Sequence, residues 1–501
     1  MSGVSRRLLA DVRLLCLILI ALHLLTPLLP EEHAWGLWPY TYLPPLWRGL
    51  LAGVVSLTYL PCYASIVCRV SPVAYGLSRI AHRAWRRLLL AISDTRLAIC
   101  DMQCAHCLFF AVVALAFAPL FWLGRIVHTR WGDAYILVNG IPHPDVRLTY
   151  NWQAPLDIFL HAKVWALGQR LFGWTDAMPA YEVLSTVAGV GFVFVLCWLA
   201  DGLGRNRTEK LLIFGLVASL GTMQLFFGYI ESYTIICVGI LVYLWLALRC
   251  LQGEGQVSSL GQVSDPGQVS DLSLLWPASV LALTHGFHPS TLVLQPSLWY
   301  LGWTLWRQGK VRGAVAVAKV LLPSVVVGLG VLALMQAGGH GLDAFLGEDF
   351  PGGGDHRWLV PLLRTTSRWE HYTMFSWAHL LDVVNEQLLT APVVLPTLML
   401  IWVFARRRLD WGHHALRFLL LAAGCYLFLT LVWNPDYGGR RDWDLFAPAS
   451  LPLTLLAAYV LPRALPERVA LRAAAWALIA VQVMHTAAWV YQNTQPWFWP
   501  K

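Results

Sequence analysis

The sequence predicts an all-α polytopic membrane protein with about 11–13 transmembrane helices and with interfacial helices in two long outer loops. Composition is the first reason, because 57% of the 501 residues are hydrophobic and only 13% are charged, whereas soluble domains carry about 25% charged residues. A series of apolar runs, each near the ~20 residues that cross a bilayer as a helix, is the second reason. The third is that every second loop between these runs is basic.

Thirteen apolar runs are expected to span the membrane, within an error of about two. Those around 274–306 and 391–405 are the shortest and have the least defined boundaries. The full set lies near residues 14–30, 49–69, 105–127, 181–200, 211–228, 233–250, 274–287, 289–306, 313–337, 391–405, 413–433, 446–462 and 471–490.

Basic residues fix the expected orientation of these spans, because cytoplasmic loops are enriched in Lys and Arg. The segment Met1–Arg13 is basic and precedes the first run without an evident cleavage site, so we expect a retained anchor with a cytoplasmic N-terminus. The alternation then holds along the whole chain. The loops it places inside contain Arg69, Arg79, Arg83, Arg86, Arg87 and Arg96; Arg205, Arg207 and Lys210; Arg307, Lys310 and Arg312; Arg406, Arg407 and Arg408; and Arg463, Arg468 and Arg472.

Four parts of the chain are distinguished on this basis. Residues 1–104 form an N-terminal module of two spans and a basic cytoplasmic loop, and residues 105–490 form the transmembrane core. Residues 252–272 contain three GQVS copies and are expected to be a disordered cytoplasmic insert. The end, 491–501, is an outer tail.

Net charge and cysteines exclude other classes of protein. The net charge is +8, but the basic residues lie in short loops, where they set topology and meet anionic lipid headgroups. We therefore expect membrane lipids and not nucleic acid as partners. Cys100, Cys104 and Cys107 with His106 have zinc-ligand chemistry, yet the paired CxxC spacing is missing, so they are interpreted as helix-end cysteines and no metal site is assigned.

Candidate site residues lie in the predicted outer loops. Asp133 follows a span and is followed at once by the apolar AYILV; a carboxylate partly desolvated at such a boundary has a raised pKa and is a better base. Ionisable groups at span ends are costly and often functional. Other candidates, from span ends and outer loops, are Asp145, Tyr229, Glu231, His285, His288, Glu370 and His371.

Arg440 and Arg441 contradict the charge rule, since they lie on the predicted outer side next to a span. Guanidinium groups bind phosphate oxygens in a bidentate manner, which favours a phosphate-binding role. A structural salt bridge to Asp442 or Asp444 is the alternative. The same DWD triplet could hold a divalent cation, although a triplet this short is a weak signal; no other cofactor is indicated.

A cytoplasmic N-terminus followed by a span, a long outer loop with an early acid and then an interfacial helix resembles the GT-C superfamily of membrane glycosyltransferases, in particular its protein-mannosyltransferase-like and aminoarabinose-transferase-like members. The matching segments are WGDAYILVNG at 131–140, NWQAPLDIFLHAKVW at 151–165 and the second outer loop at 337–390, within roughly 105–490. Two features depart from the pattern: the two spans of residues 1–104 precede the part that matches the family, which usually has a single span before this loop, and Asp133 is followed by Ala134 instead of a second acid.

The resemblance implies a hexosyl- or pentosyltransferase that takes its sugar from a polyprenyl-phosphate donor. Its site would face the periplasmic or extracellular side of the cell membrane. Asp133 would be the catalytic base, Arg440 and Arg441 would hold the donor phosphate, and the other candidates would bind substrate.

Three rival interpretations stay open. A lipid or solute transporter or flippase would show an internal repeat with broken spans in matching positions, and the sequence shows no such pairing. An acyltransferase using His285 or His288 would leave Asp133 and the two arginines without a role. A non-catalytic scaffold is the third.

Overall fold

The chain is described by a computed structural model that covers residues 1–59, 98–143, 148–252, 274–346 and 357–498. Among these residues there is no strand, and one isolated bridge pairs Leu359 with Trp433, so the all-α prediction is confirmed. The helices are α1 (Gly3–Leu25), α2 (Pro45–Leu57), α4 (Ala98–Leu123), α5 (Ala134–Gly140), α6 (Pro155–Phe172), α7 (Met178–Leu203), α8 (Arg207–Ala218), α9 (Thr234–Gln252), α10 (Leu275–Phe287), α11 (Gln295–Arg307), α12 (Gly313–Ala337), α13 (Leu342–Leu346), α14 (Trp377–Thr390), α15 (Val394–Ala405), α16 (His414–Val432), α17 (Trp443–Phe446), α18 (Ser450–Ala464) and α19 (Arg468–Asn493).

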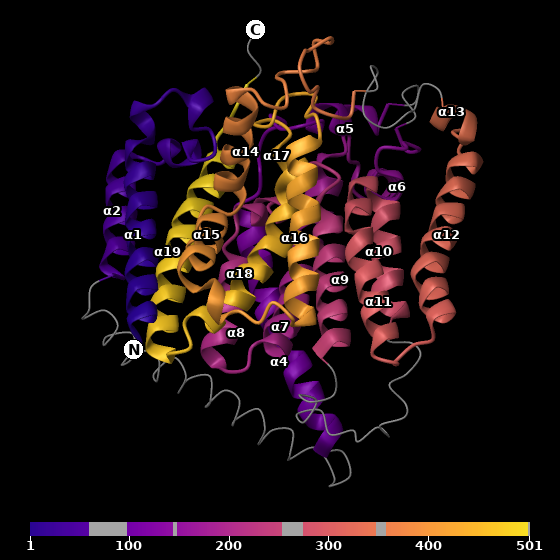
Figure 1. Cartoon of the computed structure of the whole chain (residues 1–501). Helices are drawn as coiled ribbons and strands as arrows, with labels where there is room; N and C mark the ends of the chain where they lie inside the picture. The colour runs from indigo at the N-terminus through magenta and orange to yellow at the C-terminus, as the bar shows by residue number, and fades with distance from the viewer. Residues whose placement is uncertain (60–97, 144–147, 253–273, 347–356, 499–501) are drawn as a thin grey trace.

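The helices form one bundle with their axes roughly aligned (Figure 1). Helix α1 packs against α15 and α19, so the first and last parts of the chain are neighbours. Helices α10 and α11 pack against α12, which lies at the opposite edge of the bundle.

In the described part of the chain, eight helices are long and apolar enough to cross a membrane, or up to nine if the bent pair α14–α15 counts as one span. This number is lower than the thirteen spans expected from the sequence, because five of the apolar runs form short helices. These are α2, α8, α10, α11 and α15, which have only 12 or 13 residues each. At 1.5 Å per residue such helices are about 20 Å long, short of the ~30 Å hydrocarbon layer. Hydropathy averaged along the sequence locates an apolar stretch, but it does not show where the helix within that stretch ends.

Helices α6 and α14 form in the two long loops where helices were expected, and their interfacial position stays a prediction. Helix α14 turns into α15 through a bend of 101°. Three predicted features fall outside the described residues: the basic loop at 69–96, the repeat insert apart from Gln252, and Asp145.

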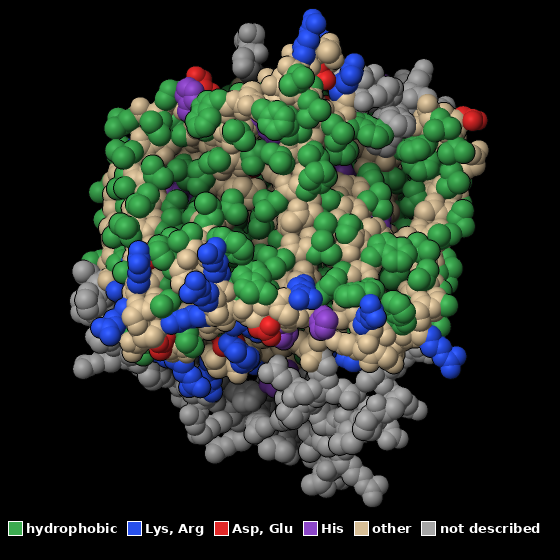
Figure 2. Space-filling model, in the orientation of Figure 1, with side chains coloured by type: hydrophobic (Ala, Val, Ile, Leu, Met, Phe, Trp, Pro, Cys, Tyr) green, Lys and Arg blue, Asp and Glu red, His purple; other side chains and the backbone are tan. Residues whose placement is uncertain are grey.

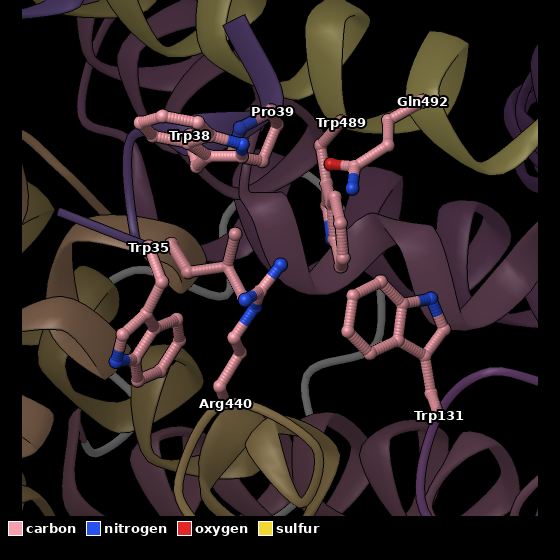
Figure 3. Close-up of a pocket in the computed structure, with 8 residues that line it drawn as sticks. Trp35, Trp38, Pro39, Trp131, Arg440, Trp489 and Gln492 are labelled. Carbon is pink, nitrogen blue, oxygen red and sulfur yellow. The ribbon is translucent and has the colours of Figure 1, made fainter. Parts of the chain in front are cut away.

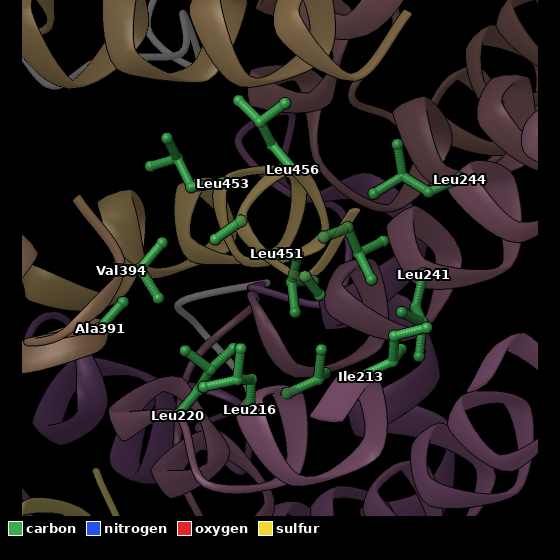
Figure 4. Close-up of a cluster of buried hydrophobic side chains, with 14 of the residues drawn as sticks. Ile213, Leu216, Leu220, Leu241, Leu244, Ala391, Val394, Leu451, Leu453 and Leu456 are labelled. Carbon is green, nitrogen blue, oxygen red and sulfur yellow. The ribbon is translucent and has the colours of Figure 1, made fainter. Parts of the chain in front are cut away.

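Helix α18 is the centre of the bundle. In the most apolar stretch of the span Trp443–Ala464, 94% of the residues are buried inside the protein, as expected of a helix that is apolar on all sides. Leu451, Leu453 and Leu456 of α18 belong to the same buried hydrophobic cluster as Leu216 of α8 and Leu241 of α9 (Figure 4). The segment that leads into α18 is thereby held in place.

The two ends of the bundle differ in charge. At one end, Arg408 donates hydrogen bonds to Ser5 Oγ (2.8 Å) and to the carbonyl of Ala464 (2.8 Å), which joins α1 and α18 near the N-terminus. Figure 2 shows Lys and Arg side chains gathered along this lower edge, beneath a broad hydrophobic belt. We call this the basic end. Helix α5 and the loop before α17 lie at the opposite end (Figure 1).

Gly221 allows a close approach between two segments, because a Cβ atom there would overlap the carbonyl oxygen of Leu389 at the end of α14. We expect Gly221→Ala to lower the melting temperature of the detergent-purified protein, at a cost of roughly 1–3 kcal/mol for overpacking. Gly191→Ala in α7 is the control, since no atom lies within 4 Å of its Cβ position. Alanine favours a helix interior, so the control should melt no lower than wild type; equal losses would contradict the packing argument.

Candidate functional site

Three segments that are far apart in sequence meet at the end of the bundle opposite the basic end. Gly132, with a φ of 46°, donates its backbone N–H to the carbonyl of Arg441 (2.9 Å). The backbone N–H of Asp133 donates to the Glu231 carboxylate. The turn before α5, the segment before α9 and the loop before α17 are therefore directly bonded to one another.

These contacts assemble a carboxylate cluster, defined as Asp133, Glu231, Asp442 and Asp444. Asp444 is 2% exposed, Glu231 is 6% exposed and Asp442 is 9% exposed, while Asp133 is half-buried. Backbone donors satisfy part of the cluster: Tyr437 N–H donates to Asp442 Oδ2 (2.7 Å), and Leu445 N–H donates to Asp444 Oδ1 (3.0 Å).

Burial raises the pKa of the cluster carboxyls that precede the spans. For Glu231 the pKa is raised well above its ordinary value by burial first and then by the charges of Asp444 and Asp133. For Asp442 burial again raises the pKa, and repulsion from Asp444 and Asp133 adds to it. Like charges this close disfavour simultaneous ionisation.

Asp133 is the member of the cluster with polar and cationic neighbours. Burial raises its pKa, whereas hydrogen bonds to Tyr437 and Gln153 and the charge of Arg441 lower it. The Arg441 guanidinium lies 4.7 Å from the centroid of the Tyr437 ring. Asp133 is thus a half-buried carboxylate beside a cation, and burial raises its pKa.

Tyrosines form the inner wall of the cluster. Tyr229 lies beside Asp444 and Glu231, and its ring meets that of Trp443 edge-on at 5.2 Å between centroids. Tyr233 is equally buried, and its ring centroid is 4.8 Å from that of His288. Of the predicted residues, Tyr229, Glu231 and Arg441 are therefore brought to Asp133.

Arg440 lines a small cavity whose walls contain several indole rings (Figure 3). It is ion-paired with Glu31, and Arg130 Nη2 lies 3.9 Å from the same carboxylate oxygen. Arg440 is thus paired with Glu31 and not with Asp442 or Asp444, which the sequence offered as alternative partners. The cavity is lined by Trp35, Trp38, Pro39, Trp131, Leu389, Arg440, Trp489 and Gln492.

The second outer loop covers the loop before α17. His371 Nε2 donates to the carbonyl of Asp436 (2.9 Å), and Trp369 meets the Tyr437 ring edge-on at 6.0 Å. Glu370 accepts hydrogen bonds from Ser367 N–H (3.0 Å) and from the backbone of Thr366. These bonds lower the pKa of Glu370 and indicate that it stabilises its own loop.

The two histidines near α10 have local partners. His285 bonds to Thr291 Oγ1 (2.8 Å) and to Gln295 Nε2 (2.9 Å), within the turn between α10 and α11. His288 Nδ1 accepts from Ser290 N–H (3.2 Å). Only His288 reaches a residue of the tyrosine wall.

Several residues at this site were missed by the sequence analysis: Glu31, Arg130, Gln153, Asp382 and Glu386. Asp382 Oδ1 accepts from Trp35 Nε1 (2.9 Å), and Asp382 Oδ2 accepts from Gly439 N–H (3.3 Å). A Cβ atom on Gly439 would come too close to Glu386. Two acids four residues apart in the amphipathic stretch of α14 were the available signal for Asp382 and Glu386.

Metal binding was considered for these carboxylates. In the described ranges, no group of three or more His, Cys, Asp or Glu side chains is arranged so that it could hold a metal ion. The divalent cation suggested by the DWD triplet stays a prediction. The side chains of Cys100 and Cys104 lie outside what the structure describes, whereas Cys107 is exposed.

The raised pKa of Glu231 predicts a pH-dependent stability. Glutamate in the unfolded chain has a pKa of about 4.3, so wild-type protein loses stability as pH rises through the higher folded-state pKa. Glu231→Gln cannot ionise and keeps its oxygen acceptor for Asp133 N–H. We expect its melting temperature to exceed that of wild type at pH 8, by roughly 1–3 °C, and the two to converge towards pH 4.

The matched control is Glu370→Gln, because hydrogen bonds lower the pKa of Glu370. Its stabilisation is present above the unfolded pKa and is lost as pH falls, so this variant should melt below wild type at pH 8. The same sign of change in both variants would refute the electrostatic explanation.

Comparison with known proteins gives a limited similarity. No protein-family model and no curated protein matches the sequence. Among solved structures, the chain is similar to ArnT from Cupriavidus metallidurans bound to undecaprenyl phosphate, with a TM-score of 0.45 and 12% identity over 77% of each chain. The apo state of that protein gives a TM-score of 0.43 at 11% identity, again over 77% of each chain. An Archaeoglobus fulgidus oligosaccharyltransferase, tethered with an acceptor peptide, gives a TM-score of 0.41 and 14% identity over 78% of this chain and 56% of that one.

Proposed function

We propose that this protein is a membrane glycosyltransferase that moves a sugar from a polyprenyl-phosphate donor to an acceptor at the non-cytoplasmic face. One observation carries the proposal: a half-buried aspartate with a raised pKa lies beside Arg441, at the edge of a buried carboxylate cluster. The cluster lies at the end of the bundle opposite the basic end. The charge rule assigns the basic end to the cytoplasm and therefore favours the outer side for the cluster.

Asp133 is proposed as the general base. Its carboxylate takes the proton of an acceptor hydroxyl, and the acceptor oxygen forms a bond to the anomeric carbon of the sugar. The bond from that carbon to the phosphate oxygen breaks, and its electron pair leaves with the polyprenyl phosphate. The raised pKa suits this role, since a base is most effective when its pKa approaches the working pH.

Charge on the leaving phosphate would be stabilised by arginines. Arg441 is already beside Asp133, and Arg440 and Arg130 share Glu31 as a partner. A phosphate presents the same acceptor chemistry to guanidinium groups as a carboxylate does, so the donor would compete with Glu31 for Arg440. Preorganised cations of this kind stabilise charge that develops in the transition state.

The remaining cluster residues would hold the sugar. Glu231 and Asp442 would accept hydrogen bonds from sugar hydroxyls, and Tyr437 would keep Asp133 oriented. Indole rings around Arg440 give an apolar wall against which a sugar face can pack. Tyr229 lies deeper, beside Asp444, where it would support the carboxylates.

The decisive experiment uses purified protein in proteoliposomes with synthetic polyprenyl-phosphate sugars and an acceptor pool from envelope extracts. We expect Asp133→Asn to lower the transfer rate by roughly 10²–10⁴-fold, the usual contribution of a general base. Asp343→Asn, at an exposed position of α13, should transfer sugar at the wild-type rate. Transfer that persists in Asp133→Asn would remove this residue from the chemistry, and movement of lipid without covalent transfer would favour a flippase.

A second prediction concerns the donor phosphate. Replacing Arg440 and Arg441 together with Gln should raise the KM for the lipid donor at least tenfold, since each charge-assisted hydrogen bond contributes about 1.5–3 kcal/mol. The control removes two exposed arginines elsewhere, Arg170 of α6 and Arg364 of the second outer loop. An unchanged KM in the Arg440/Arg441 variant would assign the pair to structure alone.

A further inference from the structure

An apolar groove lies at the basic end of the bundle, at the opposite end from the carboxylate cluster. It is formed by α15, α16, α18 and the turn between α15 and α16, and its volume of about 300 Å³ is at the lower limit of the ~300–1,000 Å³ of typical ligand sites. Its walls carry no charged side chain: Leu398, Met399, Ile401, Trp402, Val403, Leu409, Trp411, Leu416, Leu420, Leu456 and Val460.

The groove opens to the outside of the bundle. Met399 and Val403 are each 62% exposed, and Trp402 is 53% exposed. Helix α15 ends at Ala405, after 12 residues, and the chain then turns back to α16. At that turn Trp402 and Trp411 meet edge-on with centroids 5.4 Å apart and form the rim of the groove.

Two arginines are fixed to this rim. The Arg406 guanidinium lies 5.5 Å from the centroid of the Trp402 ring, and Trp411 Nε1 donates to the carbonyl of Arg406 (2.9 Å). Arg417 Nε donates to the carbonyl of Trp411 (2.7 Å). Arg406 is therefore in contact with both indoles, and Arg417 is bonded to the backbone of Trp411.

The charge around the rim is positive. Arg407 is exposed in the same turn, and Asp410 is the one acid between Arg406 and Arg417 in the sequence. Its carboxylate accepts from Gly412 N–H (2.9 Å). An apolar groove that ends in indoles and guanidinium groups matches a molecule with a hydrocarbon tail and an anionic head.

We propose that the groove binds one anionic phospholipid. An acyl chain would lie along α15 and α18, and the phosphate would be held by Arg406 and Arg417 at the level of the indole rings, where amphipathic rings are favoured. Basic pockets between helices at the cytoplasmic surface recognise anionic lipids by this combination of contacts. The inference does not rest on the proposed transferase activity, because the groove and the carboxylate cluster lie at opposite ends of the bundle.

Native mass spectrometry of the delipidated full-length protein tests the proposal, with phosphatidylglycerol and phosphatidylcholine of identical acyl chains as probes. We expect one phosphatidylglycerol to bind at least tenfold more tightly than phosphatidylcholine. In Arg406→Gln/Arg417→Gln this preference should disappear, whereas Arg307→Gln/Arg312→Gln should keep it. The control pair is exposed and belongs to the same predicted face, and Arg307 also stacks on an indole.

Met399→Trp separates the groove from the charges, because it fills an exposed part of the wall and leaves both arginines in place. It should lose the tight phosphatidylglycerol while its melting temperature stays near that of wild type. The proposal is overturned if the two lipids bind equally, if the control pair loses binding as the test pair does, or if polyprenyl phosphate binds in the groove more tightly than phosphatidylglycerol.

Discussion

The burial of several carboxylates against one another is the constraint around which the structure is organised. Ionised acids repel and lose hydration when they are buried, so Glu231, Asp442 and Asp444 can stay together only if the surrounding packing fixes them. Helix α18 supplies that packing, because its apolar surface is enclosed by α8, α9, α15 and α16. The site is therefore held by a hydrophobic core, while its own electrostatics oppose it.

The loop before α17 is fixed from three directions. Gly132 donates to its backbone at Arg441, His371 donates to its backbone at Asp436, and Gly439 donates to Asp382 of α14. The N-terminal segment joins from a further side through Glu31 and Arg440. Residues 31–42, which the family resemblance sets aside as part of an added module, therefore belong to the walls of the candidate site.

The two ends of the bundle carry different chemistry. Acids and arginines meet at one end, where a charged lipid donor and its acceptor could be brought together. At the other end arginines are attached to indoles beside an apolar groove. In such a protein the basic end would bind a membrane lipid and the opposite end would carry out the reaction, without direct contact between the two sites.

Much of the fold and part of the site follow from the sequence alone. Composition determines the all-α membrane class, and the interruption of apolar runs by polar residues determines α6 and α14. Asp133, Tyr229 and Glu231 are found because they adjoin span ends, where desolvation is a local property. The sequence also singles out Arg440 and Arg441, although only the structure separates them into one arginine beside Asp133 and one beside Glu31.

Tertiary structure alone decides the rest. Glu31 and Asp382 join the site through contacts with Arg440 and Trp35, which are 409 and 347 residues away along the chain. Arg130 joins it through Glu31, and no local pattern encodes such contacts. The number of long helices is likewise decided by where each helix ends: α10 and α15 stop after 13 and 12 residues because the turns that follow pack against neighbouring helices. Hydropathy reports the affinity of a segment for lipid, whereas its length and partners depend on the packing of the whole bundle.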